Sequence, residues 1–208
     1  MSALPTKDLA IVLKTHPSRE SDLVVHLLCA TRGKVCAIAR GARRSKRRFL
    51  SGLDVFDRGV AELRDTRVSL SALEAMSPEG GFRHLRDGLG ALSAGAVLVE
   101  AFDAMTVEDD TSDSKQFFAS LDRSLEMLDT ASKRRELEAL QSALYAGLRE
   151  LLEVSGLRRT DLRADGVSPK ALATLIHEVE GHIGRGLRSA EGVVQLLFSQ
   201  GQVTKASP

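Results

Sequence analysis

Apolar and polar residues alternate with a period of two through the first third of the chain, which is typical of strands with one buried face. A turn is expected at Arg32 and Gly33, between the second and third of these strands. The segment VCAIA is expected to form the third strand. The residues expected to share one face are Leu9, Ile11 and Leu13 on the first strand, and Leu23, Val25, Leu27 and Cys29 on the second.

Two further strands are expected before residue 80. The fourth should lie within residues 53–63, and the fifth should include the segment VSLSAL, where Val68, Leu70 and Ala72 alternate with two serines. Five short strands favour a small closed or nearly closed barrel, because closure removes exposed strand edges.

From Phe82 onward the apolar residues recur every three or four positions, as in helices with one buried face. Ser168 and Pro169 can begin one helix that Gly184 ends, and Ser189 can cap a last one. Other helices are expected through the segment AGAVLVEAF, the stripe Phe117, Leu121, Leu125 and Leu128, and the stripe Leu137, Leu140, Leu144, Leu148 and Leu151. The predicted fold class is therefore α+β, with an N-terminal β-barrel followed by an all-α helical domain.

The strand-rich and helix-rich parts of the chain also differ in their balance of basic and acidic residues. Residues 1–80 hold 14 basic and 9 acidic residues, whereas residues 81–208 hold 15 and 19. The first part therefore has the electrostatic character of a polyanion-binding module, which the net charge of +1 conceals. We expect a nucleic-acid-binding domain over 1–80, a helical domain for docking partners over 81–198, and a flexible tail over 199–208.

The chain shows no targeting signal or membrane segment. The segment MSALPTKDLA lacks the apolar run and cleavage site of a secretory signal, and no apolar stretch approaches the ~20 residues of a spanning helix. A cytoplasmic protein without a membrane partner is expected. Cys29 and Cys36 are too few for a four-thiolate zinc site and suit small buried residues in a reducing compartment. A hairpin turning at residues 31–34 would nevertheless place them opposite each other.

The most informative segment is RGARRSKRRF, which contains no acidic residue. Its six cations are Arg40, Arg43, Arg44, Lys46, Arg47 and Arg48. Arg32 and Lys34 lie one hairpin away in the predicted sheet, and Lys14 is expected near them. Gly41 and Ser45 predict a mobile loop here. Because guanidinium groups pair well with phosphate oxygens and stay charged at any relevant pH, these nine cations form the candidate DNA-binding set.

This cluster favours binding to the nucleic-acid backbone over a merely solvated loop. Base stacking needs aromatic rings, but the chain has no Trp and the barrel module offers only Phe49 and Phe56. Phe49 suits either stacking beside the loop or a place in the core. Two alternatives remain open: an RNA-binding barrel module, and a helical interaction scaffold whose basic loop docks acidic protein tails.

The sequence contains no catalytic constellation. His177 and His182 in HEVEGH are close to the helical zinc-protease pattern, but they stand five residues apart where that pattern needs four. The extra residue turns His182 about 140° from His177 around a helix, so the two cannot converge on one metal. We therefore expect no catalytic residue, no cofactor-binding residue and no metal ligand, and we expect the protein not to be an enzyme.

The runs ESDLVVHLL and RGKVCAIARGARRSKRRFLSGLDVFDRGVAEL resemble the N-terminal oligonucleotide-binding barrel (OB-fold) of the bacterial recombination mediator RecO family. Near the other end, EGHIGRGLRSAE is similar to the closing helix-turn-helix of the family. The matching barrel motifs are Glu20–Asp22, Gly33 with Lys34, Gly41–Arg44, and Gly52 with Leu53 and Phe56.

The resemblance implies a cytoplasmic, nucleoid-associated DNA-repair protein that binds single- and double-stranded DNA and anneals complementary strands. It also implies partners: RecR, the C-terminal tail of single-strand-binding protein and, indirectly, the recombinase RecA. Many relatives carry a four-cysteine zinc module in the helical region. The corresponding stretch, Gly156–Ser168, contains no cysteine, so we expect neither zinc nor any other cofactor.

Overall fold

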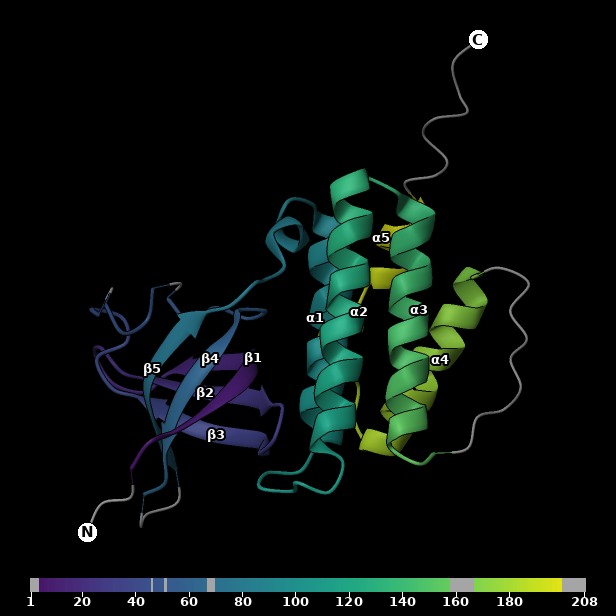
Figure 1. The fold of residues 1–208 in the computed structure, drawn as a ribbon. Helices are drawn as coiled ribbons and strands as arrows, with labels where there is room; N and C mark the ends of the chain where they lie inside the picture. The colour runs from purple at the N-terminus through teal and green to yellow at the C-terminus, as the bar shows by residue number, and fades with distance from the viewer. Residues whose placement is uncertain (1–3, 46, 51, 67–69, 158–166, 200–208) are drawn as a thin grey trace. The chain divides into compact units, whose positions relative to one another are not determined.

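A computed structural model describes residues 4–45, 47–50, 52–66, 70–157 and 167–199. Five strands form a closed barrel in the order β1-β2-β3-β5-β4, as Figure 1 shows in purple to blue. The strands are β1 (Thr6–Pro17), β2 (Leu23–Cys29), β3 (Gly33–Ala39), β4 (Arg58–Arg64) and β5 (Ser71–Pro78). Their pairing is antiparallel except between β3 and β5, where a short parallel contact closes the barrel. This topology is that of the OB-fold, so the predicted barrel is confirmed.

The interior of the barrel confirms the shared face predicted for β2. Alternate residues of β2 and β3 fill the core together with Phe49, Leu53, Leu63, Leu73 and Met76. On β1 the barrel core contains Ala10 and Val12, whereas Leu9, Ile11 and Leu13 lie outside it. Ile11 and Leu13 are nevertheless buried on the other side of the strand. A strand covered on both sides loses the alternation from which its inner face could be inferred.

Two other expectations about the strands need correction. The fifth strand begins at Ser71, later than expected, and part of the segment VSLSAL, residues 68 and 69, lies outside the described residues. Cys29 pairs with Gly33 in the β2–β3 ladder, and Cys36 pairs with His26. The two cysteines therefore do not oppose each other, and both thiols are free.

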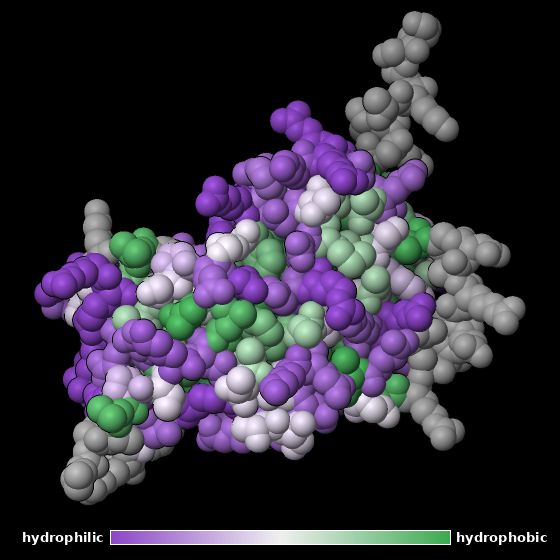
Figure 2. Space-filling model, in the orientation of Figure 1, coloured by the Kyte–Doolittle hydropathy of each residue, from purple (hydrophilic) through white to green (hydrophobic). Residues whose placement is uncertain are grey.

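The rest of the described chain is helical. The helices are η1 (Arg83–Arg86), α1 (Leu89–Met105), α2 (Ser114–Arg134), α3 (Leu137–Val154), α4 (Pro169–Ile183), η2 (Arg188–Ala190) and α5 (Val193–Ser199). The all-α second part of the fold is thus confirmed. None of the described helices is long and apolar enough to cross a membrane. Figure 2 shows a face covered mainly by hydrophilic side chains, with apolar side chains in patches among them.

The helix ends follow local rules, with one exception. The Ser168 hydroxyl accepts a hydrogen bond of 3.1 Å from the Ala171 N–H, Pro169 occupies the first turn, and Gly184 ends α4 with a left-handed φ of 75°. Ser189, expected to cap the last helix, instead donates its hydroxyl to the Glu100 carboxylate at 2.6 Å. Four such hydrogen bonds from residues 185–189 hold the pKa of Glu100 at about 2, although burial alone would raise it.

The chain forms two compact units that do not follow the strand-to-helix boundary. One unit combines residues 1–82 with 102–119, and the other combines 83–101 with 120–208. The end of α1, the acidic connection after it and the first turns of α2 therefore belong with the barrel. The predicted flexible tail lies almost entirely outside the described residues, which end at Ser199.

Candidate nucleic-acid interface

The basic segment begins directly after β3, where two hydrogen bonds hold it against the turn between β1 and β2. The Gly41 N–H donates to the Asp22 carboxylate at 2.8 Å, and the Arg43 N–H donates to the Ser21 carbonyl at 3.1 Å. Gly41 has a φ of 66°, a left-handed conformation that glycine adopts at little cost. The segment therefore leaves the barrel in a direction set by residues 20–22.

The basic segment then folds back on itself. The N–H groups of Arg44 and Ser45 both donate to the Gly41 carbonyl, at 3.1 and 3.0 Å. The Arg48 guanidinium donates to the Arg40 carbonyl at 2.7 Å and so joins the two ends of the segment. The described part of the segment is therefore anchored to the barrel at both ends.

Phe49 ends the segment inside the barrel core. Its side chain is 2% exposed, it bridges to Met76 of β5, and the Arg48 guanidinium lies 5.3 Å from the centre of its ring. Stacking of Phe49 on a base is therefore ruled out. Phe56 is buried as well. Since both phenylalanines of the module are enclosed, the geometry favours contacts with the backbone over contacts with bases.

The described arginines of the segment all present their side chains to solvent: Arg40, Arg43, Arg44, Arg47 and Arg48. Lys46 lies outside the described residues. Glu20 contacts two of the arginines: its carboxylate lies 3.3 Å from Arg44, and its carbonyl accepts a hydrogen bond of 3.2 Å from Arg43. The side chains of Arg44 and Glu20 are 72% and 89% exposed, so this ion pair contributes little stability and a phosphate can replace the carboxylate.

Arg32 and Lys34 lie at the opposite end of β3 from the basic segment, about 20 Å away for a strand of this length. The Arg32 guanidinium donates to the Asp65 carboxylate and, at 3.2 Å, to the Thr6 hydroxyl. The structure therefore does not bring these two cations together with residues 40–48, although proximity in sequence had grouped them.

The Lys34 ammonium is enclosed by the protein. Its side chain is 11% exposed, and its Nζ atom lies 2.8 Å from the Asp103 carboxylate and 2.5 Å from the Asp103 carbonyl. His26 Nδ1 lies 3.1 Å from the same carboxylate. Burial alone would raise the pKa of Asp103, but the hydrogen bonds from His26 and Lys34 outweigh it and lower the pKa to about 2. An ammonium paired in this way is not available to a phosphate.

The outer face of β2 and β3, which many OB-fold proteins use for oligonucleotides, is partly covered by residues 102–119, at the end of β3 near Lys34. Besides the Asp103 contacts, the Asp109 N–H donates to the Lys34 carbonyl at 3.0 Å, and the Ser114 hydroxyl donates to the Thr31 carbonyl at 3.3 Å. Leu28 on this face is fully buried. This end of the face is therefore occupied by the chain itself.

Lys14 and Arg19 are two more cations on the exposed surface of the barrel. Lys14 lies opposite His26 in the β1–β2 ladder. Arg19 was missed by the sequence reasoning because it stands alone among polar residues. It directly precedes Glu20, which contacts two arginines of the basic segment. The Glu-Ser-Asp motif could have pointed to Arg19. The motif contacts the basic segment, so the residue directly before the motif lies close to that segment.

The histidines of HEVEGH form no metal site among the described residues. His177 and His182 are both exposed on α4, and His177 Nδ1 lies 3.9 Å from the Glu180 carboxylate. The described part of the chain contains no group of three His, Cys, Asp or Glu residues that could hold a metal ion.

A closed five-stranded barrel with an anchored arginine-rich segment after its third strand defines an OB-fold module suited to polyanions. Residues 1–82 match the family described as Recombination protein O N terminal. The barrel of this chain is similar to that family over these residues, so the resemblance seen in the sequence is confirmed.

Relatives named DNA repair protein RecO share a larger part of the chain. The relative from Anaeromyxobacter sp. (strain K) is 38% identical over 140 residues, which cover 64% of this chain and 54% of the relative. The relative from Geobacter sulfurreducens is 37% identical over 139 residues, covering 65% and 56%. The relative from Alkaliphilus metalliredigens is 32% identical over 152 residues, covering 73% and 58%. The chain thus spans about half the length of the curated relatives it matches.

Proposed function

We propose that this protein is a non-enzymatic DNA-repair protein that binds the backbone of single- and double-stranded DNA and anneals complementary strands. The observation that carries the proposal is the anchored segment 40–48, which presents exposed arginines on a barrel of a recombination-protein family. The similarity to proteins named DNA repair protein RecO supports the same role.

Annealing requires no nucleophile and no cofactor. It requires that the repulsion between two polyanions be screened while the bases remain free to search for their register. Exposed arginines on an anchored backbone supply the screening, because they hold phosphates without enclosing the bases. Glu20 limits the affinity for DNA, since a phosphate must displace its carboxylate from Arg44. The buried Phe49 leaves base pairing undisturbed.

We also propose the partners that the family resemblance implies: RecR, the C-terminal tail of single-strand-binding protein and, through them, RecA. A groove for an acidic, apolar-tipped tail should combine cations with exposed apolar side chains. A pocket of about 430 Å³ between α2 and α3 includes such side chains, with Arg123, Arg134 and the exposed Met127 in its lining. Glu126 and Glu136 also line it, so the two arginines would have to outweigh two carboxylates. The Arg123 guanidinium pairs with Glu150 at 2.8 Å, a contact that a tail carboxylate can replace.

An annealing assay tests the proposal directly. Two complementary oligonucleotides, one with a fluorophore and one with a quencher, are mixed with the full chain, both bare and coated with single-strand-binding protein. We expect faster annealing in both cases. Failure to accelerate the annealing of bare strands at low salt contradicts the proposed function, whereas activity on bare strands alone removes only the proposed partner. Competition between single-stranded DNA and RNA of the same sequence separates the RNA-binding alternative.

A further inference from the structure

A second group of cations lies in the helical unit, where two segments almost fifty residues apart in sequence are joined by hydrogen bonds. The Asp129 carboxylate of α2 accepts the N–H groups of His84 and Leu85 at 2.6 and 3.0 Å. The Ser132 hydroxyl donates to the His84 carbonyl at 2.6 Å. The 3₁₀ turn η1 is therefore fixed against the C-terminal end of α2.

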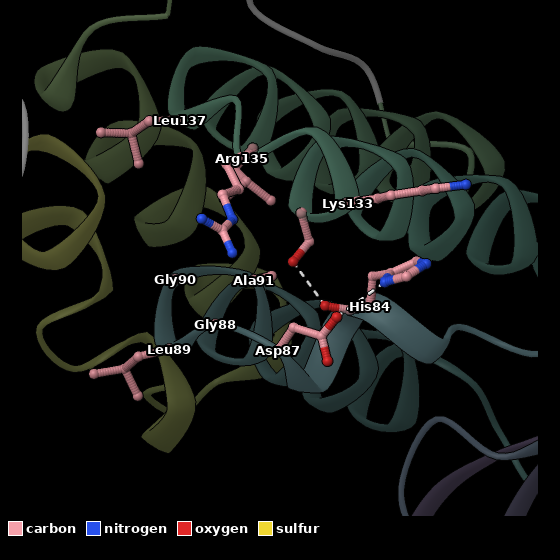
Figure 3. A pocket seen from close by; sticks show the side chains of 11 residues that line it. His84, Asp87, Gly88, Leu89, Gly90, Ala91, Lys133, Arg135 and Leu137 are labelled. Atoms are coloured by element: carbon pink, nitrogen blue, oxygen red, sulfur yellow. Dashed lines mark hydrogen bonds and ion pairs between the residues drawn. The ribbon is translucent and has the colours of Figure 1, made fainter.

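This junction borders an open pocket of about 420 Å³. His84, Lys133 and Arg135 line it together with the start of α1, and Figure 3 shows the Arg135 guanidinium pointing into it, with Lys133 and His84 to one side. The first turn of α1 contains no acidic residue. Asp87, also in the lining, is paired with His84 at 2.9 Å. The pocket is therefore cationic.

Positive charge is concentrated in the two segments that meet here, and Lys133 and Arg135 are the Lys or Arg residues among them that line the pocket. Residues 83–101 and 120–208 together hold fourteen Lys or Arg and fourteen Asp or Glu. The two short segments that meet here, 83–87 and 133–136, hold five of the cations and two of the acids. The remainder of the unit is correspondingly acidic, so a polyanion would be attracted to this pocket within the unit.

The backbone at Arg135 has an unfavourable conformation for an arginine. Its φ is 58°, and it ends α2 with hydrogen bonds from its own N–H to the Ser132 carbonyl and from the Glu136 N–H to the Ala131 carbonyl, both at 3.0 Å. This pattern is a Schellman cap, whose left-handed position usually holds glycine. A cationic side chain therefore occupies a position where glycine would be more stable, and strain of this kind is typical of functional positions.

We infer that the pocket lined by His84, Lys133 and Arg135 binds a phosphate of the DNA backbone and gives the protein a second DNA contact outside the barrel. The inference rests on the proposed function and deepens it. Two separate backbone contacts on one chain suit annealing, because each can hold a different strand or a different part of one strand. Arginine pairs with phosphate through two parallel hydrogen bonds. The Lys133 side chain points away from Arg135 in Figure 3, so it adds a longer-range attraction and no second contact to the same phosphate.

The test uses two variants of the full chain, Arg135→Gly alone and Arg135→Gly with Lys133→Gln. Binding of a fluorescently labelled oligothymidylate is measured by anisotropy over a range of salt concentrations, and unfolding is followed by heat. We expect the double variant to bind about fivefold more weakly at low salt, with the salt slope lower by about one. The melting temperature of Arg135→Gly should be unchanged or higher, because glycine relieves the strain. The matched control is Arg149→Gln, which removes a cation of the same unit outside the pocket.

The outcomes separate the second site from the proposed function. If the double variant binds the oligonucleotide as tightly as the unchanged protein while replacement of the arginines in segment 40–48 abolishes binding, the second site is refuted and the proposed function stands. If neither set of changes weakens binding, both proposals fail. A polyglutamate peptide or inorganic phosphate that binds through the pocket, without any loss of oligonucleotide affinity in the variants, also refutes the second DNA contact.

Discussion

The Asp22 carboxylate accepts a hydrogen bond of 2.8 Å from the Gly41 N–H, which links the turn before β2 to the first residues of the basic segment after β3. Replacement by alanine removes this acceptor without removing any cation. We expect Asp22→Ala to lose about 1 to 2 kcal/mol of stability and to bind DNA several-fold more weakly, because the segment is no longer held in place. Thermal unfolding and anisotropy measure the two effects, and Asp54→Ala, which leaves Gly41 untouched, is the control.

The arginines of the segment should carry most of the salt dependence of DNA binding. Changing Arg43, Arg44, Arg47 and Arg48 together to alanine removes four phosphate contacts. The slope of log affinity against log salt should then fall by about 3 for single-stranded DNA. Unchanged binding at moderate salt would show that the segment is not the interface. All four side chains are exposed, but Arg48 also joins the two ends of the segment, so a small decrease in melting temperature is expected.

Glu20 should oppose DNA binding. Its carboxylate lies 3.3 Å from the Arg44 guanidinium, at the position where a phosphate of the proposed DNA ligand would bind. We expect Glu20→Gln to increase affinity for a single-stranded oligonucleotide about two- to fivefold, since one repulsive charge and one competing contact are lost. Strand annealing measured with the same variant should slow at high protein concentration, because strands held more tightly exchange register more slowly. An affinity below that of the unchanged protein contradicts this interpretation.

Acid should weaken the attachment of residues 102–119 to the barrel. The pKa of Asp103 is lowered to about 2, so its carboxylate contributes stability that is fully present above pH ~4 and is lost as the pH falls toward 2. The contribution is roughly 2 kcal/mol. In Asp103→Asn we expect lower stability at pH 7, because Lys34 loses its charged partner, and a smaller decrease between pH 4 and 2. Chemical unfolding at several pH values measures both, and identical pH profiles would contradict the assignment.

Two glycines of the helical unit should respond in opposite ways to alanine. A methyl group at Gly147 of α3 would lie 2.8 Å from the Leu98 side chain and 2.9 Å from the Ser124 hydroxyl, where α1, α2 and α3 meet. We expect Gly147→Ala to destabilise the protein by about 1 to 3 kcal/mol. Gly181 of α4 has nothing within 4 Å of such a group, so Gly181→Ala should stabilise by about 0.5 to 1 kcal/mol. Thermal unfolding of the pair compares them directly.

The sequence predicted the elements whose local signals agree with their surroundings. The core stripe of α3 from Leu140 to Leu151 and the cap of α4 at Ser168 depend only on near neighbours, and both are as expected. The alternation along β1 does not show which side faces the barrel core, because both sides of that strand are covered and its pairing with β2 shifts between Val12 and Lys14. Periodicity does not reveal a bulge or a second covered side.

The candidate site was predictable where it is continuous in sequence and unpredictable where it is not. The density of basic residues in 40–48 marks this segment as a candidate site. The partner of Lys34, by contrast, comes from α1, almost seventy residues away, and nothing in the sequence marks Asp103 among the other acids of its segment. Likewise, the sequence does not distinguish Arg135 and His84 from other surface residues. Only the fold brings their segments together.

The covering of the β2–β3 face by residues 102–119 has a consequence for targeting. With part of that face occupied and Phe49 enclosed, the proposed DNA contact has little surface on which to distinguish one base from another. On the proposed function, binding would then not depend on DNA sequence. A partner protein would have to determine where strands are joined.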